Sequence, residues 1–427
     1  MVIELTIDTL TVGGRGLGRH EGKAVFVPLS APGDRARCRI VRRHRHYDEA
    51  ELLELLEPAP ERRTPPCPVF GRCGGCQWQH LPYERQLVWK ERLFAETLLR
   101  AGVATEAAMR PLVAAPQEFG YRGRMQYKCR FTVDGLVAGF YRHGSHYVVD
   151  TPACLLAAPA IDRTFAWLRE ELPHAPHPEA IPQLDVSCGD DGRLGVICHV
   201  LPEAAGATRP WLAEIAGRGG IAAALQAGRK ETIEVVHGDP ALTCIVDEPE
   251  MALRISAGGF SQVNPQQNRQ LVAAVLAAAE LPGSERVLDL YCGAGNFSLP
   301  LARRAGAVVG VEEYPPAIAD ARANATRLGL TNTTFRAEPA EGALSRLGGA
   351  FDLVLIDPPR TGAYPLMREL LAAAPRRVLY VSCDPATLAR DLKPLVHNGY
   401  QVISSQPFDL FPQTWHIESL TVLERRT

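Results

Sequence analysis

Long hydrophobic runs are missing from this sequence, which has no stretch approaching the roughly 18 to 20 apolar residues that a helix needs to cross a bilayer. A signal peptide is not expected either, because the first ten residues, MVIELTIDTL, carry early acids and alternate as a strand does. The chain has no large excess of charge, since its formal net charge is −2. A global basic field is thereby excluded, and any binding of nucleic acid must be local.

The composition also lacks the bias of disordered or fibrous proteins. Of the 427 residues, 46% are hydrophobic and 22% are charged, as in ordinary globular proteins. The length predicts two or three domains, each with its own core. Eleven cysteines in a chain without an expected secretion signal favour metal or catalytic roles over disulfides.

A small β-domain is predicted for residues 1–57. Residues 2–10, 24–28 and 35–41 have strand patterns, and a connection rich in turns is expected at Gly13, Gly14, Gly16 and Gly18. Residues 49–57 fit either a helix or a strand that closes a barrel. Arg35, Arg37 and Arg39 alternate and therefore share one strand face. That face is either simply solvated or part of an oligonucleotide-binding barrel.

Three cysteines follow a charged, proline-rich linker at residues 57–66. Cys67, Cys73 and Cys76 have the spacing C-x5-C-x2-C. This cluster favours a metal site, because a disulfide would use only two of the thiols. Zinc ribbons prefer two separated C-x2-C pairs, so iron–sulfur ligation with a distant fourth cysteine fits better. The candidates for that ligand are Cys129, Cys154, Cys188 and Cys198.

Basic and aromatic residues alternate beyond an amphipathic helix predicted at Tyr83–Arg100, which Gly102 ends. A hairpin turn is expected at residues 133–136. Around it lie Arg122, Arg124, Lys128, Arg130 and Arg142, interleaved with Tyr121, Tyr127, Phe131, Phe140, Tyr141 and Tyr147. We favour an RNA surface here, with cations for phosphates and rings for bases. In the alternative interpretation the rings are core and the cations are its rim.

The C-terminal part predicts a nucleotide-type doubly wound sheet, opened by RVLDLYCGAGNFSLPLA as strand, glycine turn and helix. A dinucleotide site would need a third glycine, but Gly293 and Gly295 are followed by Ser298 at that position. The next strand ends in Glu312, which is placed to bond a ribose hydroxyl. The turn therefore favours a ligand with a ribose and no phosphates, such as S-adenosylmethionine.

A buried strand at residues 378–381 leads to Cys383 and then directly into a helix. Asp384 is a good N-cap, and Pro385 suits the first helical position. Cys383 is thus expected at the sheet edge where ligands bind, beside a helix N-terminus that favours thiolate. The alternative is a small buried apolar side chain, the commonest fate of a free cysteine.

Five passages together resemble the RNA uracil-5-methyltransferases: GGFSQVN, DLYCGAGNFSL, VLIDPPRTG, YVSCDPATLARDL and DLFPQTWHIESL. The cysteine trio resembles the iron–sulfur branch that modifies 23S ribosomal RNA, and GGRGLGRHEGKAVFVPLSAPGDRARCRI resembles a TRAM domain. The likeness covers almost the whole chain and is weakest over residues 155–250. It implies an α/β fold with a Rossmann-like class I methyltransferase domain at 256–427, an N-terminal TRAM/OB-like β-barrel at 1–57, and a central α+β domain with the iron–sulfur site at 58–255.

The resemblance also implies the roles of individual residues. Cys383 would be the nucleophile and Glu418 the base that removes the C5 proton. Other matched positions hold the methyl donor and the reacting base, namely Gln262, Tyr291, Asn296, Glu312 and Asp357. A 4Fe–4S cluster is implied on Cys67, Cys73, Cys76 and Cys154. The expected partner is RNA, without a membrane or an obligate protein partner, and we expect a cytoplasmic monomer.

The reaction implied is methyl transfer to C5 of a uridine through a covalent adduct of Cys383 with C6. Ribosomal RNA is favoured, but the chain has DPPR, as in the tRNA branch, where the ribosomal branch often has DPAR. A polar residue sometimes seen near the end of the third strand is replaced around Pro339. The alternatives are a tRNA uracil methyltransferase, an amino-group RNA methyltransferase, an iron–sulfur oxidoreductase and a non-catalytic RNA-binding scaffold.

Overall fold

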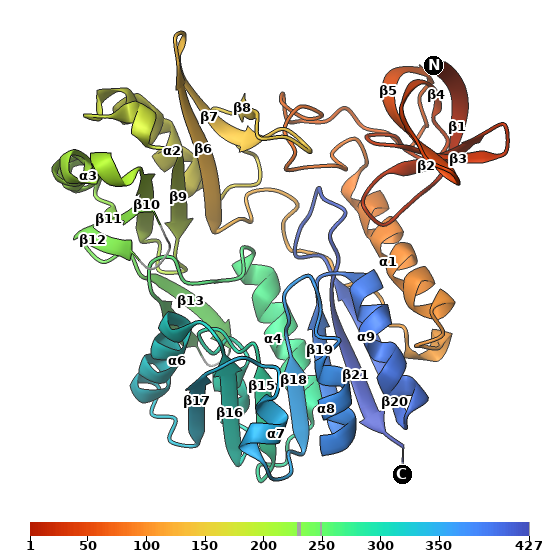
Figure 1. The fold of residues 1–427 in the computed structure, drawn as a ribbon, viewed down its shortest axis with the longest axis vertical. Helices are drawn as coiled ribbons and strands as arrows, with labels where there is room; N and C mark the ends of the chain where they lie inside the picture. The colour runs from red at the N-terminus through yellow and green to blue at the C-terminus, as the bar shows by residue number, and fades with distance from the viewer. Residues whose placement is uncertain (229–231, 248–249, 427) are drawn as a thin grey trace.

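The computed structural model describes residues 1–228, 232–247 and 250–426. Within these ranges the chain forms a closed five-stranded barrel, two seven-stranded sheets and one two-stranded sheet. Figure 1 shows the barrel and the central sheet above the C-terminal sheet, with helix α1 (Tyr83–Arg100) descending from the barrel beside helix α9 (Pro385–His397). None of the helices in these ranges has the length and apolar character needed to span a membrane.

The N-terminal strands close in the order β1-β2-β3-β5-β4. Their bounds are β1 (Val2–Leu10), β2 (Gly16–His20), β3 (Lys23–Val27), β4 (Arg35–Arg43) and β5 (Tyr47–Glu57). The ambiguous segment at 49–57 is therefore strand. The prediction that Gly16 and Gly18 belong to a turn is wrong, since both lie in β2. A Cβ on Gly18 would stand 2.3 Å from the Thr6 carbonyl oxygen, so glycine is needed there for close strand packing.

The arginines predicted to share one strand face do so on the outside of this barrel. Arg35 pairs with Glu57 at 2.7 Å, and Arg37 pairs with Glu4 at 3.0 Å. Arg39 similarly pairs with Glu51. These three charges are matched by carboxylates on neighbouring strands, which favours the interpretation of a solvated face over an RNA surface.

The central sheet has the order β12-β11-β10-β9-β6-β7-β8, and its core lies beneath helices α2 (Pro159–Glu171) and α3 (Ala205–Gly219). Its strands are β6 (Arg124–Thr132), β7 (Gly135–Tyr141), β8 (Val148–Asp150), β9 (Gln183–Cys188), β10 (Leu194–Val200), β11 (Ala222–Ala227) and β12 (Ile233–His237). The hairpin β6–β7 is found where it was predicted. Short 3-10 helices lie at Glu106–Ala108, Leu172–His174, Pro178–Ala180 and Pro202–Ala204.

A two-stranded sheet, β13 (Leu242–Asp247) and β14 (Met251–Ile255), leads to the C-terminal sheet of order β17-β16-β15-β18-β19-β21-β20. Its strands are β15 (Arg286–Leu290), β16 (Ala307–Glu312), β17 (Thr333–Ala337), β18 (Leu353–Ile356), β19 (Arg377–Ser382), β20 (Tyr400–Phe408) and β21 (Glu418–Arg425). The remaining helices are α4 (Pro265–Ala279), α5 (Ser298–Ala302), α6 (Pro315–Arg327), α7 (Ala343–Leu347) and α8 (Leu366–Ala373). All neighbouring pairs are parallel except those made by β21.

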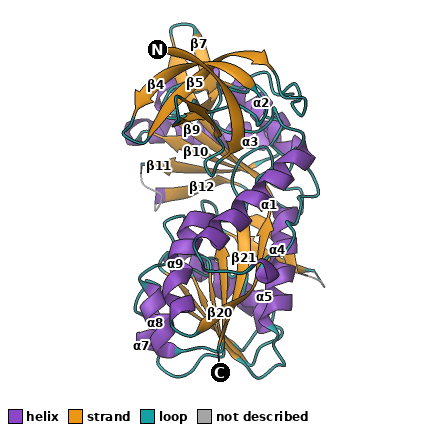
Figure 2. Cartoon of the chain, turned by 90° about the vertical axis from the view of Figure 1, so that its right-hand side faces the viewer, coloured by secondary structure: helices purple, strands orange, loops and turns teal. Residues whose placement is uncertain are grey.

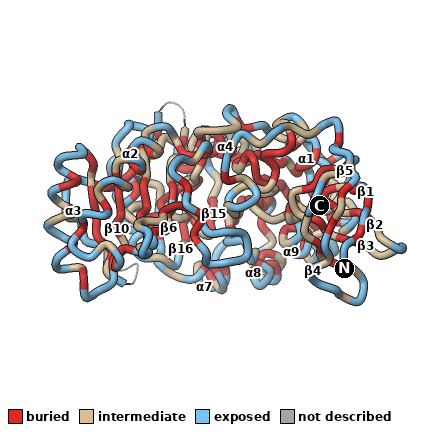
Figure 3. The backbone as a smooth tube through the Cα atoms, turned by 90° about the horizontal axis from the view of Figure 1, so that it is seen from above, coloured by how far each residue is buried: buried red, intermediate tan, exposed pale blue. Residues whose placement is uncertain are grey.

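Helix α1 links the two halves of the molecule. It packs against α9 and β20, and its residues Leu93, Phe94 and Leu98 share a core with β18 and β19. The side view in Figure 2 shows α1 between the upper sheets and the C-terminal sheet. Figure 3 shows that the strands of both large sheets are mostly buried, whereas many connections between them are exposed.

Candidate active site

Three neighbouring strands bring Asp357, Cys383 and Glu418 to one edge of the C-terminal sheet. Ser382, the last residue of β19, lies opposite Ser419 of β21, and the hydroxyl of Ser419 donates to the Ser382 carbonyl at 3.1 Å. Cys383 and Glu418 are therefore the next facing positions along this antiparallel pair. Asp357 directly follows β18, the parallel neighbour on the other side of β19.

The turn after Cys383 has the predicted capping geometry. The carboxylate of Asp384 accepts the backbone N–H groups of Ala386 at 3.0 Å and Thr387 at 2.9 Å, and Pro385 begins α9. The expected preference for thiolate is wrong in this structure. Burial and the nearby carboxylates of Glu418 and Asp357 raise the pKa of the Cys383 thiol to about 12.

Both carboxyl groups at this edge also hold their protons more tightly than usual. Glu418 is 5% exposed, and burial followed by the charge of Asp357 raises its pKa well above the ordinary value. Burial, with a smaller effect of Asp289, raises the pKa of Asp357 to about 7. The site therefore favours the neutral forms of these groups, and it lies in a low-dielectric environment suited to proton transfer.

Arg360, Trp415 and His416 flank this edge, and sequence reasoning did not find them. The Arg360 guanidinium lies 4.8 Å from the Trp415 ring and 3.8 Å from the Asp384 carboxylate. Trp415 stacks on His416 with ring centroids 4.3 Å apart. Burial, and then the charge of Arg360, lowers the pKa of His416 to about 4. Their only sequence signals were the DPPR and QTWHIE motifs.

The residues predicted to hold the methyl donor line the neighbouring strand ends. Tyr291 follows β15 with a left-handed φ of +64°, and its hydroxyl donates to Glu341 at 3.0 Å. The amides of Asn296 and Asn268 bond each other at 2.8 and 3.1 Å. Glu312 ends β16 and accepts the backbone N–H of Tyr314 at 2.9 Å. Gln262 is half-buried, two residues before Asn264, the N-cap of α4.

Asp289 is a buried carboxylate beneath this turn that sequence reasoning also missed. Its Oδ2 accepts a bond from the Ser298 hydroxyl, while its Oδ1 has no hydrogen-bond partner within the described ranges. Burial raises its pKa to about 7. A Cβ on Gly293 would meet no atom within 4 Å, so the space above the turn is open. An unpaired buried oxygen beside an open turn is consistent with a site for a polar ligand.

The four predicted metal-binding cysteines lie near one another in the central part. Burial raises the pKa of Cys76 to about 12, and Cys154, Cys73 and Cys67 each add to the rise, against a hydrogen bond from Gln79. Of the other candidates, Cys129 and Cys198 are buried in the core beneath α2 and α3. In the described part of the chain no three His, Cys, Asp or Glu side chains are arranged to hold a metal ion. The thiols are neighbours without forming an assembled site.

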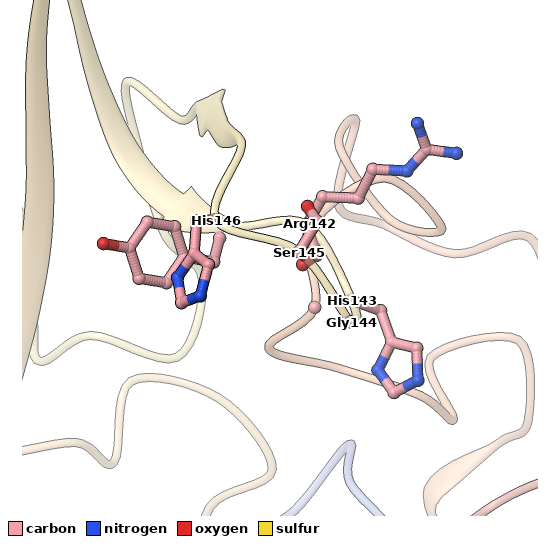
Figure 4. Close-up of a pocket in the computed structure, with 7 residues that line it drawn as sticks. Arg142, His143, Gly144, Ser145 and His146 are labelled. Carbon is pink, nitrogen blue, oxygen red and sulfur yellow. Dashed lines mark hydrogen bonds between the residues drawn. The ribbon is translucent and has the colours of Figure 1, made fainter.

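The cysteine loop is joined to the turn that follows β7. The backbone N–H of Gly74 donates to the Tyr141 carbonyl at 2.9 Å, and the backbones of Cys73 and Arg142 form an isolated antiparallel β-bridge. A Cβ on Gly74 would stand 2.9 Å from the His143 nitrogen, so only glycine fits. Gly74 and residues 141–146 line an open cavity of about 420 Å³. Figure 4 shows Arg142 and His143 extending from this turn in different directions.

The predicted basic and aromatic surface is partly core. Tyr121 and Tyr127 are buried, whereas Tyr141 and Tyr147 are 37% and 72% exposed. Alternation along β6 places Met125, Tyr127 and Cys129 in the core and Arg124, Gln126, Lys128 and Arg130 on the opposite face. The interpretation as core is confirmed for Tyr121 and Tyr127, whereas the RNA surface stays a prediction for the exposed rings of Tyr141 and Tyr147.

Asp185 is a buried acid on that opposite face. It pairs with Arg124 at 3.2 Å and with His199 at 3.3 Å. Burial acts to raise its pKa, but hydrogen bonds from His199, Gln183 and Gln126 outweigh burial and lower the pKa to about 2. Its charge is consequently compensated within the sheet.

Comparison with known proteins gives two family matches. The model described as tRNA (Uracil-5-)-methyltransferase matches residues 226–426, and the TRAM domain model matches residues 1–53. The chain is 37% identical over 430 residues to a 23S rRNA (uracil(1939)-C(5))-methyltransferase of Alkalilimnicola ehrlichii, covering 99% of this chain and 96% of that protein. The corresponding enzyme of Pectobacterium atrosepticum is 34% identical, covering 98% and 93%.

A solved structure shares the whole architecture. It is the Pyrococcus abyssi tRNA (uracil-54, C5)-methyltransferase in complex with S-adenosyl-L-homocysteine, with a TM-score of 0.71 and 24% identity. The match covers 99% of this chain and 100% of that one. At this identity the likeness supports the class I methyltransferase fold of the C-terminal sheet.

Proposed function

The chain belongs to the RNA (uracil-5-)-methyltransferase family, and on that premise we propose that it transfers a methyl group from S-adenosylmethionine to C5 of a uridine in 23S ribosomal RNA. The observation that carries the proposal is the meeting of Cys383, Glu418 and Asp357 at adjacent strand ends. A methyltransferase acting on exocyclic amino groups would need no such thiol. Ribosomal RNA is favoured because the two relatives described above are named for that substrate.

Cys383 and Glu418 have complementary roles in the proposed mechanism. The Cys383 thiolate adds to C6 of the uracil, and C5 of the enolate so formed would take the methyl group of S-adenosylmethionine, whose S–CH3 bond breaks to leave S-adenosylhomocysteine. Glu418 then takes the C5 proton, the C5=C6 double bond returns, and the thiolate leaves. A positioned carboxylate contributes about 10²–10⁴-fold to such a step. Asp357, whose charge acts to raise the pKa of both groups, is proposed to hold the reacting base.

The methyl donor is proposed to lie over the turn after β15. Gln262, Tyr291, Asn296 and Glu312 would bind it, with Glu312 at the ribose. The unpaired Oδ1 of buried Asp289 and the open space above Gly293 support a polar ligand here. When bound, S-adenosylmethionine supplies an electrophilic methyl group. The chain's own residues orient it and exclude water.

Cys67, Cys73, Cys76 and Cys154 are proposed to hold a 4Fe–4S cluster. Two observations support this assignment: the other three thiols lie close enough to raise the pKa of Cys76, and all four donors are thiols. When bound, the cluster would cross-link the cysteine loop to the segment around Cys154. Anaerobically purified protein should be brown and contain about four irons. A colourless, zinc-loaded anaerobic preparation would contradict the assignment.

The substrate RNA is proposed to contact the turn after β7 and the polar face of β6. Arg130, Arg142, His143 and His146 are exposed there beside the rings of Tyr141 and Tyr147. Such rings can stack on unpaired bases, and the cations can neutralise phosphates. Flipping the target base costs a few kcal/mol, which these contacts would offset. We further propose a cytoplasmic monomer with functional units at 1–57, 58–255 and 256–427.

A tRNA substrate is the second candidate, favoured by the DPPR motif. The two candidates are separated by adding the purified enzyme to total RNA from a strain that lacks it and mapping the uridine that gains a 5-methyl group. Methylation of a 23S uridine supports the proposal, whereas methylation of tRNA alone overturns the choice of substrate. An amino-methylated product would overturn the reaction itself.

A further inference from the structure

The segment that leads into Glu418 is irregular and largely buried. Residues 409–417 join β20 to β21, and buried backbone without regular structure must satisfy its polar groups through other contacts. Gln413 lies near the centre of this segment and is fully buried. Its φ of +70° is left-handed, a conformation that a residue other than glycine keeps only when its surroundings hold it.

The backbone of Gln413 is held by residues that follow the cysteine loop. Its carbonyl oxygen accepts the N–H groups of both Gln77 and Trp78 at 3.0 Å. Its own N–H donates to the side-chain oxygen of Gln86 at 2.9 Å. Three bonds thus fix the peptide groups on either side of this one residue.

The side chain of Gln413 is bonded at both ends. Its Oε1 accepts from Gln86 Nε2 at 2.9 Å and from Arg63 Nη2 at 3.1 Å. Its Nε2 donates to Glu118 Oε2 at 3.0 Å. Arg63 precedes the cysteine trio in the chain, Gln86 follows it, and Glu118 lies further along. Gln413 therefore bonds to three separate segments.

The same short stretch also holds both ends of the cysteine loop. Gln77 comes directly after Cys76, and the side chain of Gln79 accepts the backbone N–H of Cys67 at 3.2 Å. Arg63 donates from Nε to the Gln79 carbonyl at 3.0 Å. Residues 77–79 therefore contact the cysteine loop on one side and the segment before Glu418 on the other.

We propose that Gln413 is a positioning residue that transmits the order of the cysteine loop to Glu418; this inference rests on the proposed function. Residues 77 and 78 hold Gln413 through the bonds described above, residue 79 ties them to the cysteine loop, and Gln413 in turn fixes the segment that leads to Glu418, so that Glu418 stands where it takes the C5 proton. That step breaks the C5–H bond, leaves its electron pair to form C5=C6, and expels the Cys383 sulfur from C6 as thiolate. Loosening Gln413 therefore slows release of the adduct more than its formation.

The test is a single-turnover experiment with Gln413→Ala in the iron-loaded enzyme. We expect the covalent RNA adduct to accumulate because its breakdown slows about 10- to 100-fold, the range expected when a catalytic group is slightly misplaced. The KM for RNA should stay within about twofold, since substrate contacts are unchanged. Iron content should equal that of the wild type. Gln406→Ala is the matched control, because Gln406 on β20 donates one bond to the Pro111 carbonyl at 3.2 Å.

Cys76→Ser should also slow adduct breakdown, and the double variant should be no slower than the worse single variant, because both changes act through the same bonds. Gln86→Ala removes two of the bonds to Gln413 and replaces Gln413→Ala if that protein does not fold. Equal slowing of adduct formation and breakdown, or additive effects in the double variant, would overturn the inference. If wild-type enzyme forms neither adduct nor 5-methyluridine, the proposed function fails instead.

Discussion

Cys383 favours its protonated form, since burial, Glu418 and Asp357 raise the pKa of its thiol to about 12. The reaction needs the thiolate, so some group must act in the opposite direction. The guanidinium of Arg360 does so, and it is held between Asp384 and the ring of Trp415. Arg360 thus favours the thiolate of Cys383, the proposed nucleophile, against these larger effects.

Arg360→Ala should move the pH dependence of adduct formation to higher pH. Loss of the positive charge raises the pKa of Cys383 further, and below that pKa the thiolate fraction rises tenfold per pH unit. We expect the rate at neutral pH to fall roughly 3- to 10-fold. Rapid-quench measurements from pH 6 to 10 check this, with Arg360→Lys as the variant that keeps the charge. An unshifted profile in Arg360→Ala would count against this role.

Glu418→Gln should trap the covalent intermediate. The amide cannot accept the C5 proton, so adduct breakdown should slow by about 10²- to 10⁴-fold while the thiol still adds to C6. Denaturing electrophoresis and mass spectrometry should detect RNA bound to Cys383. Cys383→Ala/Glu418→Gln is the control and should form no adduct. Recovery of free RNA with unreacted uracil from Glu418→Gln would show that Glu418 is not the base.

At the scale of elements, α1 is attached to the segment before β21 by a buried ion pair. Lys90 Nζ lies 2.6 Å from Asp409 Oδ1, and both side chains are fully buried. Lys90 also donates to the Phe411 carbonyl at 3.1 Å. Burial lowers the pKa of Lys90, although Asp409 opposes this effect. The ion pair thus joins α1 to the segment that leads into Glu418 at the start of β21.

Lys90→Met should lower the free energy of unfolding by about 3–5 kcal/mol, because Asp409 is left buried without its cation. Lys90→Met/Asp409→Leu should recover most of this loss. Arg92→Met on the same helix is the control, since the exposed pair of Arg92 with Glu96 is worth at most about 0.5 kcal/mol. Urea unfolding of the three variants measures the differences. A double variant as unstable as Lys90→Met would contradict the explanation.

Periodicity in the sequence predicted most of these helices and strands. It failed where contacts between residues far apart in the sequence determine the local structure. Helix Tyr83–Arg100, the hairpin turn at residues 133–136 and the cap at Asp384 are found as expected, because each depends on local pattern. Strand β2 was missed because its glycines serve close packing rather than a turn. The pKa of Cys383 was misjudged because Glu418 and Asp357 come from other strands. Lys90 and Gln413 had no local signal at all.

At the scale of the whole molecule, the arginines divide into two populations. On the barrel strand β4, three of them pair with glutamates: Arg35 with Glu57, Arg37 with Glu4 and Glu54, and Arg39 with Glu51. Arg142, beside the cysteine loop, is exposed and has no carboxylate partner within the described ranges. Cations without partners have more to gain from phosphates, because they give up no existing pair.

Arg142→Glu should therefore weaken RNA binding more than Arg37→Glu. We expect the slope of log Kd against log salt to fall by about 1 for Arg142→Glu, as for one lost phosphate contact. Arg37→Glu should leave that slope within error, apart from any effect on barrel stability. Filter binding of substrate RNA over a range of potassium chloride concentrations measures both. Equal losses in the two variants would place the RNA on the barrel as well.

Strand β21 follows every other strand of its sheet in the chain, yet it lies between β19 and β20. During synthesis, Cys383, the proposed nucleophile directly after β19, is thus translated before β21, which begins with the proposed base Glu418. Until β21 inserts, β19 and β20 each keep an unpaired edge, which is prone to association with other chains. The proposed catalytic pair of Cys383 and Glu418 is therefore complete only after β21 has been inserted, and an incomplete nascent chain carries the Cys383 thiol without Glu418 beside it.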